Sequence, residues 1–229
     1  MRAVLFGGVC LALAACGGGA DQASGAPDAE QIAAESAALT GYLDGEFEEE
    51  LRRSPEWLTR LGRDDRQDEL SDVTEAAMDA DLAWRRESVE AMKAQFDYDK
   101  LNDVAKTSYD IWELELEREQ AARPWRRHQY IFARGGPHTG LPNFMINFHE
   151  VDNVEDMEAY VARISEIGRV IDEYLVRAKA ATDDGVRMPR FAYEQTLSEA
   201  QRVTSGAPFD GGAPSPLYEN VLDNTQALV

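Results

Sequence analysis

Apolar residues recur at intervals of three and four along most of the chain, and this spacing predicts amphipathic helices. The most regular run covers residues 153–184. The same spacing predicts helices over about 29–51, 72–96 and 101–121, and one more from about Pro189. In the most regular helix, the residues expected to face the core are Met157, Tyr160, Val161, Ile164, Ile167, Ile171, Tyr174, Leu175 and Ala178. The pattern therefore predicts an all-α protein, an array of long amphipathic helices.

Residues that begin and end helices stand at the ends of these runs. The stretch 54–62 begins Ser-Pro and ends in glycine, which is typical of a short helix with a left-handed last residue. Asp72, with Glu75 three residues later, predicts a capping box at the start of the next long helix. The Ser215-Pro216 pair repeats the first signal and predicts a further helix.

The helical pattern is interrupted near residues 128–150. His128 to Phe132 favours β structure, so a short strand or an extended segment is expected there. Glycines and prolines follow over 135–142 and predict a loop.

This loop is the candidate substrate-contact loop of the chain. Two adjacent glycines let a backbone approach a ligand closely and expose its N–H groups. The residues concerned are Gly135, Gly136, Pro137 and His138. The alternative interpretation is a tight connection between packed elements.

The first residues have the pattern of a secretory signal: a positive start, an apolar run over 3–13 and small residues after it. The end of this run, Leu13-Ala14-Ala15-Cys16, resembles a bacterial lipoprotein signal, whose cysteine is lipidated and becomes the first residue. The alternative is an ordinary signal peptide with a chance cysteine.

The expected organisation follows from this signal. Residues 1–15 would be the lipoprotein signal peptide, 16–28 a flexible tether rich in Gly, Ala and Ser, and 29–229 a helical domain. The expected location is the bacterial cell envelope, with a lipid anchor in the outer membrane and the protein facing the periplasm. Two or more acyl chains hold a protein firmly, so no apolar protein surface is needed at the membrane.

The net charge of −20 over 229 residues argues against two classes of binding partner. Nucleic acid is excluded as a partner, because a phosphate backbone is bound by stripes of Lys and Arg. Docking of a bare acidic face onto anionic lipid is also disfavoured. The charge is best interpreted as a well-solvated surface.

The histidines are the residues around which a catalytic motif could be built. A zinc-protease helix reads His-Glu-x-x-His, because two histidines one turn apart share a face and the Glu activates a water. His149-Glu150 begins this motif, but Asn153 stands where the second histidine should be. His149 is therefore expected to be a structural hydrogen-bonding residue. His128 and His138 are too far away in sequence to complete a metal site, so no catalytic residue or metal ligand is assigned.

Several motifs, taken in order, resemble the bacterial domain-of-unknown-function 885 (DUF885) family from roughly Leu43 to the end. They are Ser54-Pro55-Glu56-Trp57-Leu58-Thr59-Arg60-Leu61-Gly62, Gln129 with Gly136-Pro137-His138 and Leu141-Pro142, Tyr160-Val161-Ala162-Arg163-Ile164, and Gly185-Val186-Arg187-Met188-Pro189-Arg190. The family resemblance implies a longer, mostly helical protein similar to gluzincin peptidases, with its zinc motif in a C-terminal half.

Two functions are then expected. In the first, the chain is an N-terminal fragment of a lipid-anchored, zinc-dependent peptidase-like protein and forms a wall of its substrate cleft; a peptide would be the partner and zinc the cofactor of the full-length protein. The uncapped helix that reaches Val229 favours truncation. In the second, the chain is a non-catalytic helical lipoprotein that acts as a binding or scaffold module.

Overall fold

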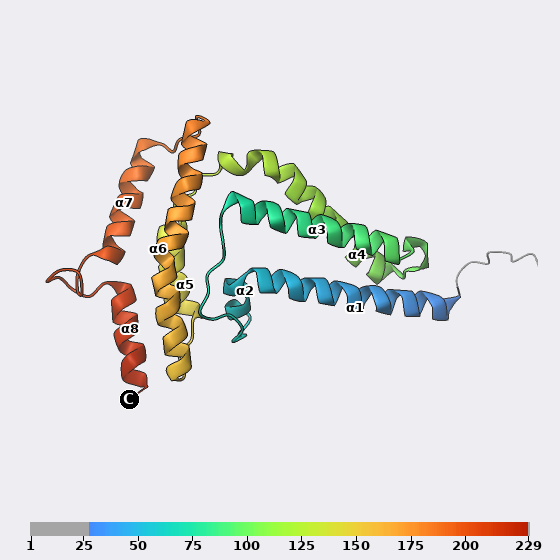
Figure 1. Cartoon of the computed structure of the whole chain (residues 1–229), viewed down its shortest axis with the longest axis horizontal. Coiled ribbons are helices and arrows are strands. Elements are labelled where there is room, and N and C mark those ends of the chain that lie inside the picture. Colours follow the sequence, from blue (N-terminus) through green and yellow to red (C-terminus); the bar gives the residue numbers. More distant parts are fainter. Residues whose placement is uncertain (1–27, 229) are drawn as a thin grey trace, which may run out of the picture.

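The computed structural model describes residues 28–228, and within this part the chain forms α-helices and short 3-10 helices without a strand (Figure 1). The all-α prediction is confirmed. The predicted signal peptide, Cys16 and nearly all of the predicted tether lie outside the described residues. The helices are α1 (Ala29–Arg53), α2 (Pro55–Arg60), α3 (Glu75–Gln95), η1 (Tyr98–Lys100), α4 (Asp103–Ala122), η2 (Arg123–His128), α5 (Pro137–Phe148), α6 (Val154–Asp183), α7 (Arg190–Thr204) and α8 (Pro216–Ala227).

The helices pack around two hydrophobic cores. The first core lies between α1, α3 and α4, which run side by side in Figure 1. Met92 and Trp112 are buried in it, and both lie in helices that the apolar spacing predicted. The Trp112 indole N–H donates to the Ser88 hydroxyl at 3.0 Å, so the polar atom of this buried ring is satisfied.

The second core lies between α5, α6 and α8, with Leu70 from the connector before α3. Met145, Tyr160 and Val170 are its most buried members. The long helix α6 runs across the direction of α1, α3 and α4, and α2 lies where the two groups of helices meet (Figure 1).

The connector over 62–74 has no regular structure, and side chains of α6 satisfy part of its backbone. Arg169 donates to the Leu70 carbonyl at 3.1 Å, and Arg177 donates to the Val73 carbonyl at 3.2 Å. The Val73 N–H donates to Glu173 at 3.1 Å. These bonds replace the ladder that a helix or a sheet would supply and tie the connector to α6.

The predicted start of α8 at Ser215 and the predicted left-handed residue after α2, Gly62, are confirmed. Asp28 and Gln31 form a capping box at α1, Asn153 caps α6 through the Asp156 N–H, and Ser215 caps α8. Gly62 and Gly185 have positive φ angles of 72° and 88° after α2 and α6.

Two predicted caps were wrong. Helix α3 begins at Glu75 with Thr74 as its cap, because the Asp72 carboxylate instead accepts the Thr74 N–H at 2.8 Å and turns the chain before the helix. The Ser54 side chain makes no capping bond to α2.

The predicted strand and loop were also wrong in part. Residues 128–132 lie at the end of η2 and in the turns after it. Gly140 and Pro142 lie inside α5, because Pro137 suits a first helical turn and buried apolar residues further on hold the helix despite the internal proline. The irregular segment is therefore limited to 129–136.

Helix α7 confirms the helix predicted from about Pro189, but it buries no residue completely. Leu197 is 63% exposed. The apolar face of α7 instead borders a pocket. No helix among residues 28–228 has both the length and the apolar character needed to cross a bilayer.

Candidate functional site

The two adjacent glycines serve different purposes in the turn before α5. Gly135 has a φ of 76°, a conformation that glycine adopts without steric cost. Gly136 has an ordinary φ but no room for a side chain, since a Cβ there would collide with the Ile131 carbonyl oxygen and lie 2.9 Å from that of Ala133. The Gly136 N–H donates to the Ala133 carbonyl at 2.8 Å. The pair therefore forms the tight connection that was the alternative interpretation of this motif.

The turn nevertheless borders two hollows, one on each side. Gly135, Gly136 and Pro137 line a hollow of about 620 Å³, whereas His138 lines a pocket of about 500 Å³. The four residues of the candidate substrate-contact loop are therefore divided between two neighbouring spaces. Residues 129–131 line both and form the wall between them.

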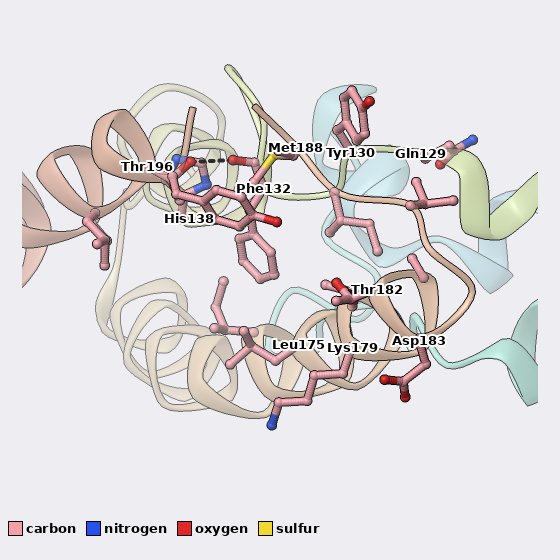
Figure 2. Close-up of a pocket in the computed structure, with 18 residues that line it drawn as sticks. Gln129, Tyr130, Phe132, His138, Leu175, Lys179, Thr182, Asp183, Met188 and Thr196 are labelled. Carbon is pink, nitrogen blue, oxygen red and sulfur yellow. Dashed lines mark hydrogen bonds between the residues drawn. The ribbon is translucent and has the colours of Figure 1, made fainter. Parts of the chain in front are cut away.

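The 500 Å³ pocket lies between the 129–132 segment, the end of α6 and α7 (Figure 2). Ligand pockets are usually a few hundred to about 1,000 Å³ in volume and mostly apolar, and this pocket fits both descriptions. In Figure 2 the Lys179 amine and the Asp183 carboxylate point away from the space. Its apolar lining consists of Tyr130, Ile131, Phe132, Ile171, Leu175, Ala178, Ala181, Val186, Met188, Tyr193, Leu197 and Ala200.

Two polar side chains hold α7 against this pocket. The Thr196 hydroxyl donates to the Phe132 carbonyl, and His138 Nε2 lies 2.9 Å from the Glu199 carboxylate. Hydrogen bonds from Gln195 and His138 lower the pKa of Glu199, so this carboxylate stays ionised beside the histidine. His138 Nδ1 is buried without a hydrogen-bond partner among residues 28–228. His138 therefore fixes α7 on α5 at the edge of the pocket.

His149 is a structural residue, as the missing second zinc histidine indicated. Its Nδ1 accepts a hydrogen bond from Arg163 at 3.1 Å, so its Nε2 carries the hydrogen and lies 3.3 Å from the Asp156 carbonyl. Burial and the neighbouring Arg163 lower the pKa of His149 to about 4, so the ring is neutral at pH 7. Glu150 is exposed.

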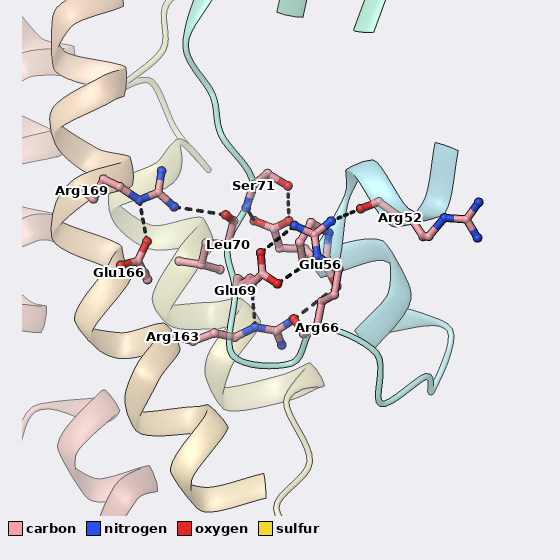
Figure 3. Close-up of polar contacts among 10 residues, drawn as sticks. Arg52, Glu56, Arg66, Glu69, Leu70, Ser71, Arg163, Glu166 and Arg169 are labelled. Atoms are coloured by element: carbon pink, nitrogen blue, oxygen red, sulfur yellow. Dashed lines mark hydrogen bonds and ion pairs between the residues drawn. The ribbon is translucent and has the colours of Figure 1, made fainter. Parts of the chain in front are cut away.

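Arg163 was not singled out by sequence reasoning, although it is fully buried. Besides His149, its guanidinium donates to the carbonyls of Glu69 at 2.9 Å, Arg66 at 3.1 Å and Pro55 at 3.3 Å (Figure 3). Burial lowers the pKa of Arg163 to about 10, which still leaves it charged at pH 7. Besides its place in the Tyr160–Ile164 motif, its signal in the sequence is a charged residue on the apolar side of the helix, three positions after Tyr160.

Arg66 supports this arrangement from the connector. It has a positive φ of 57°, which is uncommon for a residue other than glycine. Its side chain donates to the Arg52 carbonyl and pairs with Glu69 at 2.6 Å (Figure 3). These bonds fix the backbone at Arg66, whose carbonyl accepts from Arg163. The motif that begins at Ser54 and the motif around Arg163 thus meet at one buried joint between the two groups of helices.

No group of three or more His, Cys, Asp or Glu side chains within 28–228 is placed to hold a metal ion. The described residues therefore do not fit a zinc site. They form an apolar pocket and, next to it, a second hollow. Both are lined by helix α6, which the bonds of Arg163 connect to the segment between α2 and α3.

The chain was compared with known proteins. Residues 55–228 match the family described as "Bacterial protein of unknown function (DUF885)". The chain belongs to this family, as its ordered motifs indicated. No curated protein matches the chain.

Proposed function

We propose that this chain forms the N-terminal helical wall of a substrate cleft in a lipid-anchored, zinc-dependent peptidase-like protein. The observation that carries the proposal is the 500 Å³ apolar pocket at the His138 turn, in a member of the DUF885 family. The expected similarity of the DUF885 family to gluzincin peptidases suggests the reaction, and the pocket suggests how a peptide would be held.

The chemistry of the pocket suits the side chain of a bulky apolar residue. Its lining is mostly aliphatic and aromatic, and burying such a side chain is worth roughly 1.5–3 kcal/mol. Rigid elements frame the pocket, because α6 is a 30-residue helix and α7 is attached to α5 through His138 and Glu199. A rigid pocket of this kind binds one residue of a peptide and thereby positions the neighbouring peptide bonds.

In this proposal the zinc ligands and the water-activating carboxylate come from residues other than 28–228. The described residues would contribute binding and orientation of the substrate. The anchor would be Cys16, joined to α1 by the tether over 16–28. A Cys16→Ser variant should then leave the membrane fraction, and its retention there would contradict the lipid anchor.

The proposal is tested on the protein purified from the membranes of its native host. Zinc is measured by mass spectrometry, and cleavage of a peptide library is followed with and without a chelator. We expect bound zinc and chelator-sensitive cleavage next to bulky apolar residues. A native protein with neither zinc nor cleavage would contradict the peptidase role and favour the alternative, a non-catalytic binding or scaffold lipoprotein.

A pair of variants tests the role of the pocket itself. Leu197 lines the pocket and is 63% exposed, so Leu197→Glu should place a charge there without unfolding the protein. Ile111 on α4 is 50% exposed and lines none of the hollows described above, so Ile111→Glu is the matched control. We expect Leu197→Glu to lower kcat/KM at least tenfold for peptides with a bulky apolar residue, and Ile111→Glu to leave it unchanged. Equal activity of the two variants would exclude the pocket from substrate binding.

A further inference from the structure

The second hollow, of about 620 Å³, has an unusual charge for this protein. It lies on the other side of the 129–131 wall and is bordered by α2, α5 and α6. Its charged lining residues are Arg60, Arg134 and Arg177, with Glu56 as the single acid. A local excess of positive charge stands out in a chain whose net charge is −20.

These arginines lack the partners that other arginines of the protein have. Arg127 contacts Glu75 and Asp184, and Arg169 contacts Glu166 and Glu173. By contrast, within residues 28–228 none of the three arginines of the hollow forms an ion pair with a carboxylate.

The one acid of the hollow is already engaged. The Glu56 carboxylate accepts the Ser71 N–H at 3.1 Å and also the Ser71 hydroxyl (Figure 3). Glu56 thus forms no ion pair with the three arginines of 28–228 that line the hollow, and their charge exceeds its own, which favours an anion from outside.

Aromatic rings support two of the guanidinium groups. Arg60 lies over the Phe148 ring at 4.0 Å, and Arg177 lies over the Tyr174 ring at 5.4 Å. Stacking fixes the plane of a guanidinium and leaves N–H groups at its edge to donate. One of these groups, Nη1 of Arg177, already donates to the Val73 carbonyl. A planar fork of N–H donors matches the two oxygens of a carboxylate.

We propose that this hollow binds a carboxylate of the peptide substrate, while the adjoining apolar pocket holds the side chain next to it. The identification of the ligand as a peptide rests on the proposed function. Residues 129–131 line both spaces, so the two spaces are neighbours. A single ligand that reaches over this wall would place a carboxylate in one space and an apolar side chain in the other. The chemical class that carries a carboxylate next to a bulky apolar side chain is a peptide with an apolar C-terminal residue.

The N-terminus of α5 adds to the same charge. This helix begins at Pro137, and Gly136 caps it without a side chain. Pro137 and Gly136 line the arginine-rich hollow, so the positive end of the helix dipole adds to the field of the three arginines. The arrangement selects for a negative group and against an uncharged amide.

Calorimetric titration of the purified full-chain protein tests this proposal. The probes are N-acetylated Ala-Ala-Phe with a free C-terminal carboxylate and the same peptide as the C-terminal amide. We expect the amide to bind roughly tenfold more weakly, as is usual for the loss of a charge-assisted contact. Binding of the free acid should also weaken as sodium chloride is raised from 50 to 300 mM, because salt screens exposed charges.

Arg134→Gln is the decisive variant. The Arg134 side chain is exposed and forms no hydrogen bond or ion pair with another residue of 28–228, so its loss should not disturb the fold. Arg86→Gln is the matched control, because Arg86 on α3 is also exposed and lines none of the hollows described above. We expect Arg134→Gln to remove the preference for the free acid and Arg86→Gln to retain it.

Three results would overturn the proposal: equal binding of acid and amide, an equal loss in both variants, or binding of inorganic phosphate without binding of the free acid. None of these measurements requires zinc or turnover. A protein that prefers the free acid but cleaves no peptide would retain the carboxylate site and lose only the peptidase role.

Discussion

At the scale of single residues, the absence of a side chain at Gly136 shapes the turn that separates the two hollows. A Cβ at this position would meet two backbone carbonyl oxygens, which cannot move aside as a flexible side chain could. We therefore expect Gly136→Ala to destabilise the protein by about 1–3 kcal/mol, as overpacking does. Urea unfolding at pH 7.5 measures this change.

Gly168→Ala is the matched control. Gly168 lies inside α6, and a Cβ there would meet nothing within 4 Å. Alanine should stabilise this helix by about 0.5–1 kcal/mol, because glycine loses more conformational freedom on folding. A similar effect of the two substitutions would show that the turn can adjust and that Gly136 is not required.

His149 should make the folded protein less stable as the pH falls. Its pKa is lowered to about 4 in the folded protein, against about 6.5 in the unfolded chain. As the pH falls below 6.5, the unfolded chain binds a proton that the folded protein excludes, so the free energy of unfolding decreases until about pH 4. The full loss from this one residue amounts to about 3 kcal/mol, at 1.36 kcal/mol for each pKa unit.

Urea unfolding of the wild type and of His149→Gln between pH 7.5 and 4.5 checks this prediction. The glutamine variant cannot take up the proton, so its stability should change less over this range. Parallel curves for the two proteins would mean that His149 is free to protonate in the folded state.

At the scale of elements, apolar periodicity predicted the long helices well, because each buries a stripe at the spacing of its own turns. Gly62 and Ser215 could be identified as helix-end signals because capping is local chemistry that the sequence contains directly. The start of α3 was misplaced because Asp72 could cap a helix or form a turn, and the bond to the Thr74 N–H favours the turn.

Thr74 should therefore carry the capping energy of α3. Its hydroxyl accepts the Ala77 N–H at 3.1 Å, and Thr74→Ala should cost about 1 kcal/mol. Thr107→Ala inside α4 is the same change at a site where the hydroxyl only donates to the Asp103 carbonyl, so it should be neutral or slightly stabilising. Thermal unfolding measures the stability of both variants. An equal loss of stability in the two would mean that Thr74 does not act as a cap.

The candidate site was predicted less completely than the helices. The sequence marks Gly135 and Gly136 as a special backbone position, but it does not show that the turn divides two hollows. Arg60 contacts Phe148 and Arg177 contacts the Val73 carbonyl, both distant in the sequence. Only the folded structure therefore shows that neither arginine forms an ion pair with a carboxylate of residues 28–228. Helix α7 buries no residue completely, and its apolar face borders the pocket, which the spacing of its apolar residues does not reveal.

At the scale of the whole molecule, two groups of helices with separate cores meet at the segment between α2 and α3. Hydrophobic burial alone fixes neither their relative position nor the path of an irregular connector. Arg163 does both, because one buried guanidinium joins α6 to the carbonyls of Pro55, Arg66 and Glu69. Both hollows depend on this joint, since α6 lines each of them.

Arg163→Met tests how much the buried bonds of Arg163 contribute to stability and whether they couple the two cores. Replacing a buried ion pair by apolar residues can be neutral, but here the acceptors are backbone carbonyls and a histidine that remain after the substitution. They would be left buried without donors, so we expect a loss on the order of 3–5 kcal/mol in the free energy of unfolding, followed by Trp fluorescence in urea. Arg118→Met on the exposed side of α4 is the control and should change stability by less than about 0.5 kcal/mol. Native-state hydrogen exchange should show earlier opening of α5 and α6 than of the first core in Arg163→Met, because α6 loses its buried bonds to Pro55, Arg66 and Glu69. Uniform opening of both cores would instead mean that they unfold as one unit and that the joint is not the weak point between them.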